Sequence, residues 1–228
     1  MTLRAVFWDM DGTLIDSEPY WHESELAIAR RYGGTWNEDL GWQMSGTALI
    51  LCARKMREMG TDLPESQIAD LMVQYVAERE RETMPWTPGA LDVLRSLAKA
   101  GIPSVLVTSS PRTLAEVVIQ QAPNNAFTAF VCGDDGLASK PDPAPYIYAA
   151  KTIHIDPQHI AECVALEDSP SGLQSAIAAG ATTVAVTGFT RTDVSDQHQY
   201  ATIDSYAGID ARALEAFVES RKQQMHRR

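Results

Sequence analysis

The 228-residue sequence has few cysteines and no long apolar run. Its three cysteines, Cys52, Cys132 and Cys163, lie far apart and form no Cys-x-x-Cys pair. Their odd number and wide spacing indicate reduced thiols, as expected in a cytoplasmic protein, and not a disulfide framework. No apolar run approaches the roughly 20 residues of a membrane span. The N-terminus runs directly into a strand pattern, so we expect no signal peptide and no membrane partner.

Basic residues are also scarce. The chain has 19 Lys and Arg against 30 Asp and Glu, which gives a formal net charge of −11. Binding to a nucleic acid backbone requires a basic face, so we expect no nucleic acid partner. A phosphate-bearing small ligand is compatible with this charge if a local lysine or a metal ion supplies the positive charge.

The most informative stretch is Asp9-Met10-Asp11-Gly12-Thr13-Leu14, which follows the apolar residues 5–8. A short continuous apolar run predicts a buried strand, and ligands of open α/β sheets bind at the carboxyl ends of strands. If the backbone stays extended, the Asp9 and Asp11 carboxylates point the same way. At about 4 Å their repulsion amounts to about 4 kcal/mol at an effective dielectric near 20. Such a pair implies a bound cation or a shared proton, and the alternative is a solvated Asp-x-Asp-Gly turn.

The arrangement of helical and strand patterns predicts two parts. Residues 17–82 carry helical patterns without a strand signal, and we expect residues 35–46 to be irregular. From residue 90 onward strand and helix patterns alternate, which predicts a doubly wound parallel, Rossmann-like sheet. We therefore expect an α/β core of residues 1–16 and 83–228, with a helical cap domain of residues 17–82 inserted after the first strand.

Three further strand ends carry polar residues. Thr108-Ser109-Ser110 follows one apolar strand, where hydroxyls suit either a phosphate or the cap of the next helix. Lys140 precedes a proline and is either a point charge for phosphate or part of a solvated loop. Glu167 and Asp168 end another apolar strand, where they suit a cation, or Asp168 caps the next helix.

These four segments, in this order and each at a strand end, resemble the four motifs of the haloacid dehalogenase-like superfamily. The stretch Gly172-Leu173-Gln174-Ser175-Ala176-Ile177-Ala178-Ala179-Gly180 is also similar to that family. The helical insert after the first motif resembles the cap of the β-phosphoglucomutase-like subgroup. The resemblance extends over essentially the whole chain.

The resemblance implies a Mg²⁺-dependent phosphatase that works through an aspartyl-phosphate. By this resemblance Asp9 is the nucleophile, and Asp11 is the general acid and then the general base. The metal ligands would be the Asp9 carboxylate, the Asp11 backbone carbonyl and Asp168, with Glu167 in or near the coordination shell. Mg²⁺ prefers such oxygen ligands.

The same resemblance implies a small phosphorylated metabolite, a sugar or polyol phosphate, as the substrate. We expect the protein to be a monomer. Thr108, Ser109 and Lys140 would bind the phosphoryl oxygens. We expect the cap to contact the leaving group. The cap residues concerned are Glu18, Trp21 and Gln43.

Two other functions stay open. A β-phosphoglucomutase-type mutase presents a histidine and an arginine from its cap, but here those positions fall on Trp21, beside His22, and near Leu49. The second alternative is a phosphate-ligand-binding protein without enzymatic activity. That protein would be expected to lack at least one catalytic acid, and none is missing here.

Overall fold

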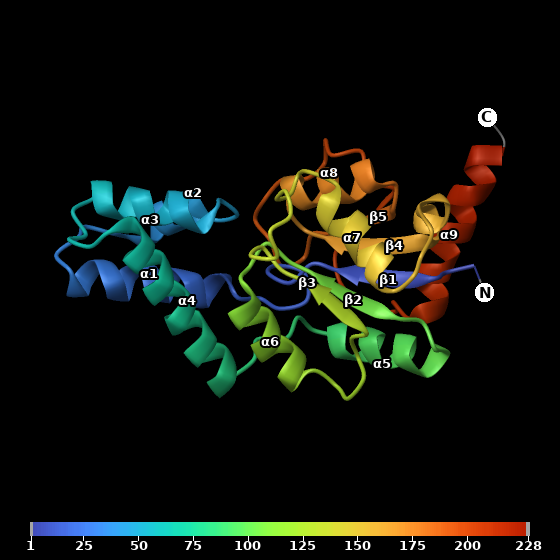
Figure 1. Ribbon diagram of the computed structural model, residues 1–228, viewed down its shortest axis with the longest axis horizontal. Helices are drawn as coiled ribbons and strands as arrows, with labels where there is room; N and C mark the ends of the chain where they lie inside the picture. The colour runs from blue at the N-terminus through green and yellow to red at the C-terminus, as the bar shows by residue number, and fades with distance from the viewer. Residues whose placement is uncertain (1, 227–228) are drawn as a thin grey trace. The chain divides into compact units, whose positions relative to one another are not determined.

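The computed structural model describes residues 2–226, and the chain divides into two compact units. Met1–Asp16 and Trp86–Arg228 form the core unit, and Ser17–Pro85 forms the helical unit (Figure 1). Residues 83–85 group with the helical unit, three residues beyond the expected boundary. The reason is local, because the Tyr20 hydroxyl donates a hydrogen bond to the Thr83 carbonyl at 2.9 Å.

The core unit contains one sheet of six parallel strands, as predicted for a doubly wound fold. The strand order is β3-β2-β1-β4-β5-β6. The strands are β1 (Ala5–Trp8), β2 (Ser104–Val107), β3 (Ala129–Val131), β4 (Cys163–Glu167), β5 (Thr182–Val186) and β6 (Ala201–Ile203).

Strand burial explains the apolar runs of the sequence. Every residue of β1, β2, β4 and β5 is buried, as expected for parallel strands covered on both faces. The two edge strands, β3 and β6, have three residues each and are partly exposed. Strand β6 carries no clear apolar run, and the sequence therefore did not predict it.

Helices cover both faces of this sheet (Figure 1). Helices α5 and α9 pack together, with α5 against β2 and α9 against β4 and β5. Helices α7 and α8 pack together over β2, β3, β4 and β5. The helical segments of the core are α5 (Ala90–Ala100), α6 (Arg112–Gln121), α7 (Ala144–Thr152), the 3₁₀ turn Pro157–Glu162, α8 (Pro170–Ala179) and α9 (Ala211–His226).

The central strand β1 brings the polar strand ends together. Trp8, its last residue, pairs with Leu106 of β2 on one side and with Leu166 of β4 on the other. Because the three strands are parallel, the residues that follow them emerge at the same edge of the sheet. The residues after Trp8, Val107 and Leu166 therefore lie close together.

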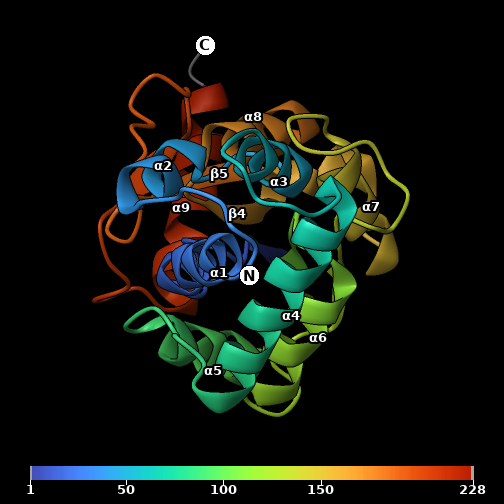
Figure 2. The ribbon, with the colours of Figure 1, turned by 90° about the vertical axis from the view of Figure 1, so that its left-hand side faces the viewer.

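The helical unit contains four helices, labelled α1 to α4 in Figure 2. They pack around an apolar cluster of their own. They are α1 (Glu18–Arg31), α2 (Glu38–Met44), α3 (Leu49–Glu58) and α4 (Glu65–Glu82). Helices α1 and α3 both pack against α4. The cluster includes Ile28, Ala53, Met56, Ile68 and Met72.

Helix α2 corrects the expectation that residues 35–46 are irregular. Its N-cap is Asn37, whose side chain accepts a hydrogen bond from the Leu40 amide at 2.9 Å. The helix is short and contains Gly41, a weak helix former, so these residues carry no periodic apolar pattern. Packing supplies the reason for the glycine, because a Cβ at Gly41 would lie 3.0 Å from both His22 and Glu25 of α1.

The two chain segments that lead to the helical unit pair with each other inside the core unit. Ile15 forms an antiparallel bridge with Trp86, and the Thr87 amide donates to the Leu14 carbonyl at 3.1 Å. The Thr87 hydroxyl lies 2.9 Å from the carbonyls of both Thr13 and Leu14. The chain therefore leaves and re-enters the core at neighbouring points. Across residues 2–226, no helix is long and apolar enough to cross a membrane.

Candidate active site

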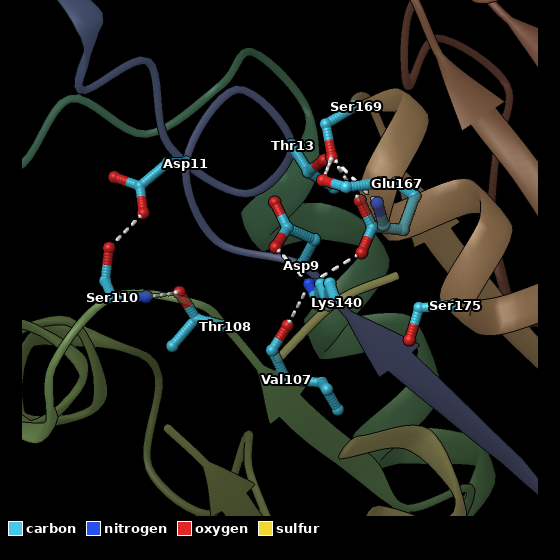
Figure 3. Close-up of polar contacts among 12 residues, drawn as sticks. Asp9, Asp11, Thr13, Val107, Thr108, Ser110, Lys140, Glu167, Ser169 and Ser175 are labelled. Atoms are coloured by element: carbon cyan, nitrogen blue, oxygen red, sulfur yellow. Dashed lines mark hydrogen bonds and ion pairs between the residues drawn. The ribbon is translucent and has the colours of Figure 1, made fainter. Parts of the chain in front are cut away.

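Lys140 contacts Asp9 and Glu167, two of the acids predicted at strand ends (Figure 3). Its ammonium nitrogen donates to Asp9 Oδ1 at 2.7 Å, to Glu167 Oε1 at 2.6 Å and to the Val107 carbonyl at 2.8 Å. These three acceptors come from the ends of β1, β4 and β2. Since an ammonium group has three protons, the lysine uses all of its donors within the protein.

These contacts are buried. Burial strengthens the attraction between Lys140 and the carboxylates, and it also makes ionisation of the carboxylates costly. The Lys140 side chain is 3% exposed and the Glu167 side chain is 0% exposed. Burial alone would lower the pKa of Lys140, but Asp9 and Glu167 raise it above its ordinary value. Burial, and then the charge of Glu167, raise the pKa of Asp9 to about 7, although Lys140 opposes the shift.

Asp168 completes a cluster of three acids. One carboxylate oxygen from each of Asp9, Glu167 and Asp168 lies within 4.8 Å of the others. Burial and the charges of Asp9 and Glu167 raise the pKa of Asp168 well above its usual range. The Thr13 hydroxyl donates to Asp168 Oδ1 at 3.3 Å.

This donor set fits a divalent cation. Three buried carboxylates face one ammonium group, so negative charge exceeds positive charge in a region where burial makes that excess costly. The ligand atoms offered are all oxygens, and there is no cysteine or histidine in this cluster. Hard oxygen donors are the ligands that Mg²⁺ prefers, whereas softer metals favour sulfur or imidazole.

Asp11 does not join this cluster, which corrects the expectation that the two carboxylates point the same way. The chain turns directly after Met10, whose carbonyl accepts the amides of Thr13, Leu14 and Ile15. The Asp11 carboxylate then points toward Ser110, whose hydroxyl donates to Asp11 Oδ2 at 2.6 Å (Figure 3). The two acids at one strand end therefore have different surroundings.

The backbone holds Ser110 in place for this contact. Its amide donates to Thr108 Oγ1 at 2.9 Å, and its carbonyl accepts the Gly133 amide at 3.0 Å. Sequence reasoning recognised the hydroxyl run but chose Thr108 and Ser109 as the binding residues. Ser110 could not be assigned to Asp11 from the sequence, because the contact joins residues 99 positions apart.

The predicted phosphate-binding residues share one small pocket. Thr108, Ser109 and Lys140 line it together with Cys132 and Gly133. Burial raises the pKa of the Cys132 thiol to about 12. The thiol is therefore protonated at neutral pH and is a poor nucleophile.

Sequence reasoning missed one further residue, Tyr146 of α7. Its side chain is completely buried, and its hydroxyl donates a short hydrogen bond to Glu167 Oε1. Burial, followed by the charge of Glu167, raises the pKa of Tyr146 well above its usual range, so the hydroxyl stays protonated. In the sequence, Tyr146 belongs to an apolar helical face. Such a face indicates a core residue but does not predict a hydrogen bond to Glu167.

The three predicted cap residues belong to the helical unit. Glu18 begins α1, and Trp21 of the same helix packs against the apolar cluster. Gln43 lies on α2 with its side chain exposed. Their expected contacts with a leaving group stay predictions.

Comparison with known proteins identifies the family. A family model for haloacid dehalogenase-like hydrolases matches residues 3–180, and the chain belongs to this family. Hexitol phosphatase A of Escherichia coli is 32% identical over 82% of this chain and 84% of its own length. A phosphorylated carbohydrates phosphatase of Thermotoga maritima is 30% identical over 78% and 82% of the two chains. The predicted enzyme class, a phosphoric monoester hydrolase, agrees with these relatives, which are named phosphatases.

Solved structures support the fold. A family IA hydrolase of the same superfamily from Entamoeba histolytica superposes with a TM-score of 0.82 at 22% identity, over 95% of this chain and 100% of that one. CbbY from Rhodobacter sphaeroides, in complex with phosphate, gives a TM-score of 0.81 at 23% identity, over 93% and 99% of the two chains. These superpositions confirm the predicted fold, and the family model confirms the recognition of the superfamily.

Proposed function

We propose that this protein is a Mg²⁺-dependent phosphatase that hydrolyses a small sugar or polyol phosphate through an aspartyl-phosphate on Asp9. The observation that carries the proposal is the different setting of the two acids. Asp9 is held by an ammonium group within the acidic cluster, whereas Asp11 is held outside that cluster by a hydroxyl. Two carboxylates in unlike environments are suited to two chemical roles.

In the first step Asp9 attacks phosphorus. A bond forms between a carboxylate oxygen and phosphorus, and the bond from phosphorus to the substrate oxygen breaks. Asp11 donates a proton to the departing alkoxide, which leaves as the alcohol. Lys140 orients Asp9, and the charge of its ammonium group favours the ionised, reactive form of the carboxylate.

In the second step the aspartyl-phosphate is hydrolysed. Asp11, now ionised, removes a proton from water as the water oxygen attacks phosphorus. The bond between Asp9 and phosphorus breaks, which releases inorganic phosphate and restores the carboxylate. Thr108 and Ser109 bind phosphoryl oxygens from the pocket that they line with Lys140.

A bound Mg²⁺ would be held by carboxylate oxygens of Asp9, Asp168 and Glu167 and by the Asp11 backbone carbonyl. The ion would supply positive charge that offsets the charge of the carboxylates and the phosphoryl group. The excess of buried carboxylates over ammonium groups supports this assignment.

The named substrates of the relatives support the proposed substrate class. The sequence matches a hexitol phosphatase and a phosphorylated carbohydrates phosphatase at 30% identity or more. A phosphoglycolate phosphatase of Pseudomonas putida is also 30% identical, over 81% of this chain and 69% of its own length. Phosphoglycolate therefore belongs in the same test.

The test is release of inorganic phosphate from hexitol, hexose, glycerol and glycolate phosphates and from an aryl phosphate, with Mg²⁺ or with excess chelator. We expect release with Mg²⁺, highest for a sugar or polyol phosphate, and none with chelator. The Asp9→Asn variant is the control. Full turnover in chelator would overturn the metal assignment, and binding of phosphate esters without release would favour the non-enzymatic alternative.

The same assay separates a phosphatase from a mutase. A mutase would convert one hexose phosphate into its isomer without releasing phosphate. His22, which lies beside the position of the mutase histidine, is buried, and its ring contacts Trp42 edge-on and Ser45 at 3.2 Å. This internal engagement supports the phosphatase.

A further inference from the structure

Tyr146 of α7 is completely buried and contacts Glu167 of the acidic cluster. Its ring centroid is 5.3 Å from the Lys140 ammonium nitrogen and 6.0 Å from the Phe7 ring centroid. Its hydroxyl donates to the same Glu167 oxygen, Oε1, that accepts a hydrogen bond from Lys140. The tyrosine therefore contacts both partners of the buried ion pair between Lys140 and Glu167.

The donors around Glu167 are unevenly shared between its two oxygens. Oε1 accepts from Lys140 at 2.6 Å and from Tyr146, whereas Oε2 has a long contact of 3.4 Å with the Ser169 hydroxyl. Two hydrogen bonds to the same oxygen fix the orientation of the Glu167 carboxylate. Without the tyrosine, Lys140 alone would hold Oε1, and Lys140 also has to hold Asp9.

We propose that Tyr146 is a positioning residue that fixes the orientation of Glu167 and thereby sets the Mg²⁺ affinity of the site. The proposal rests on the metal assignment made under the proposed function. Hydrogen bonds to the groups that surround a metal orient the ligands, and their loss typically weakens metal affinity or activity by about 10- to 100-fold. Tyr146 does not touch the substrate in this role.

The alternative is that Tyr146 only fills the core. A phenylalanine at this position would keep the ring and its packing and remove the hydroxyl alone. A purely structural role would leave metal binding unchanged in that variant. The Tyr146→Phe variant therefore separates the two explanations.

The experiment measures the dissociation constant of Mg²⁺ for the substrate-free protein of 228 residues by calorimetry. We expect Tyr146→Phe to weaken Mg²⁺ binding by about tenfold or more. Tyr148→Phe is the matched control, since Tyr148 lies on the same helix with 41% of its surface exposed, and we expect no change. Thermal unfolding of both variants checks that the fold is kept.

A double-mutant cycle with Glu167→Ala tests whether Tyr146 influences Mg²⁺ affinity through Glu167. If Tyr146 acts through Glu167, adding Tyr146→Phe to Glu167→Ala changes the Mg²⁺ dissociation constant by less than twofold. An equal loss in both backgrounds would overturn the proposal. If Glu167→Ala does not fold, the comparison of Tyr146→Phe with Tyr148→Phe decides alone.

The outcomes separate this proposal from the proposed function. Normal Mg²⁺ binding by Tyr146→Phe, within twofold of the unmodified protein, would overturn the role of Tyr146 and leave the phosphatase intact. Weakened binding in a protein that releases no phosphate from any substrate would support Tyr146 and overturn the phosphatase. Failure of the unmodified protein to bind Mg²⁺ would overturn both the metal assignment and this proposal.

Discussion

Asp9 and Asp11 differ in their contacts although they are two residues apart. The ammonium group of Lys140 donates a hydrogen bond to Asp9 Oδ1, and the hydroxyl of Ser110 donates one to Asp11 Oδ2. A model in which both acids only bind a metal predicts similar damage when either is replaced. The two-step reaction proposed above predicts different damage.

The first prediction concerns replacement of each acid by asparagine. Asp9→Asn lacks the nucleophile, so no phosphoenzyme forms. Asp11→Asn keeps the nucleophile and the backbone carbonyl but loses proton transfer, which typically contributes about 10²- to 10⁴-fold to the rate. With an aryl phosphate, whose leaving group needs little protonation, Asp11→Asn should form the aspartyl-phosphate and hydrolyse it slowly.

Intact-protein mass spectrometry measures this intermediate. We expect Asp11→Asn to gain roughly 80 Da, the mass of a phosphoryl group on the nucleophile. Asp9→Asn should show no adduct. An adduct in Asp9→Asn, or one that peptide mapping places on another residue, would contradict the assigned roles.

The sequence predicts a site residue when the pattern that marks it lies in the neighbouring residues of the chain. Asp9, Glu167 and Asp168 could be foreseen because they end apolar strands that the parallel sheet brings together. Lys140 lies in the loop between β3 and α7, and it was chosen because its segment resembles a motif of the superfamily. The contact of Tyr146 with Glu167 was not visible, because it depends on how α7 packs over β4. The apolar residues of α7 also do not share one buried face, since Ile147 is 45% exposed whereas Tyr146 and Ala150 are buried.

At the junction of β4 and α8, the backbone of Gly172 lies close to the Glu167 carboxylate. Ser169 is the N-cap of α8, and its hydroxyl accepts the Gly172 amide at 3.1 Å. A Cβ at Gly172 would lie 1.9 Å from Glu167 Oε2. Since Cβ atoms do not occupy such distances, any side chain here requires Glu167 or the helix to move.

The second prediction is that Gly172→Ala displaces Glu167. Overpacking of this kind typically lowers the free energy of unfolding by about 1–3 kcal/mol. A misplacement of about 1 Å in an active site can lower the rate by about 10²-fold, so we expect a loss of that order. Thermal unfolding and kcat for an aryl phosphate measure the two effects.

Gln174→Ala is the control for this variant, because Gln174 lies on the same helix with its side chain exposed. Its activity should stay within twofold of the unmodified protein. Activity of Gly172→Ala at that same level would contradict the tight packing of α8 on Glu167.

Most elements were foreseen, and the exceptions have a common cause. The buried strands β1, β2, β4 and β5 form apolar runs, and most helices have an apolar face. Helix α2 and strand β6 have seven and three residues, too short for a periodic pattern. Each depends on contacts from elsewhere in the chain, such as the approach of Gly41 to α1.

Each of the two units has an apolar cluster of its own. One cluster is built from the sheet and the helices α7 and α8, and includes Phe7, Val105, Tyr146 and Ala165. The other is built entirely within the helical unit. Separate clusters are a property of chain segments that can fold independently.

The third prediction is that the core folds without the helical unit. Residues 17–85 are replaced by a short Gly-Ser linker, which is feasible because Ile15 already pairs with Trp86. We expect one cooperative thermal transition and retained Mg²⁺ binding, since all proposed metal ligands belong to the core. Circular dichroism and calorimetry measure both. A non-cooperative transition in this variant would show that the core depends on the helical unit.

The central position of β1 has a consequence for synthesis of the chain. Val6 pairs with Ser104 on one side and with Val164 on the other. On the ribosome, the first strand is made long before either neighbour, and the entire helical unit is made in between. The nascent chain therefore carries an unpaired apolar strand while the insert can already fold around its own cluster. Because of this strand order, the ribosome or a chaperone has to shield residues 5–8 during that interval.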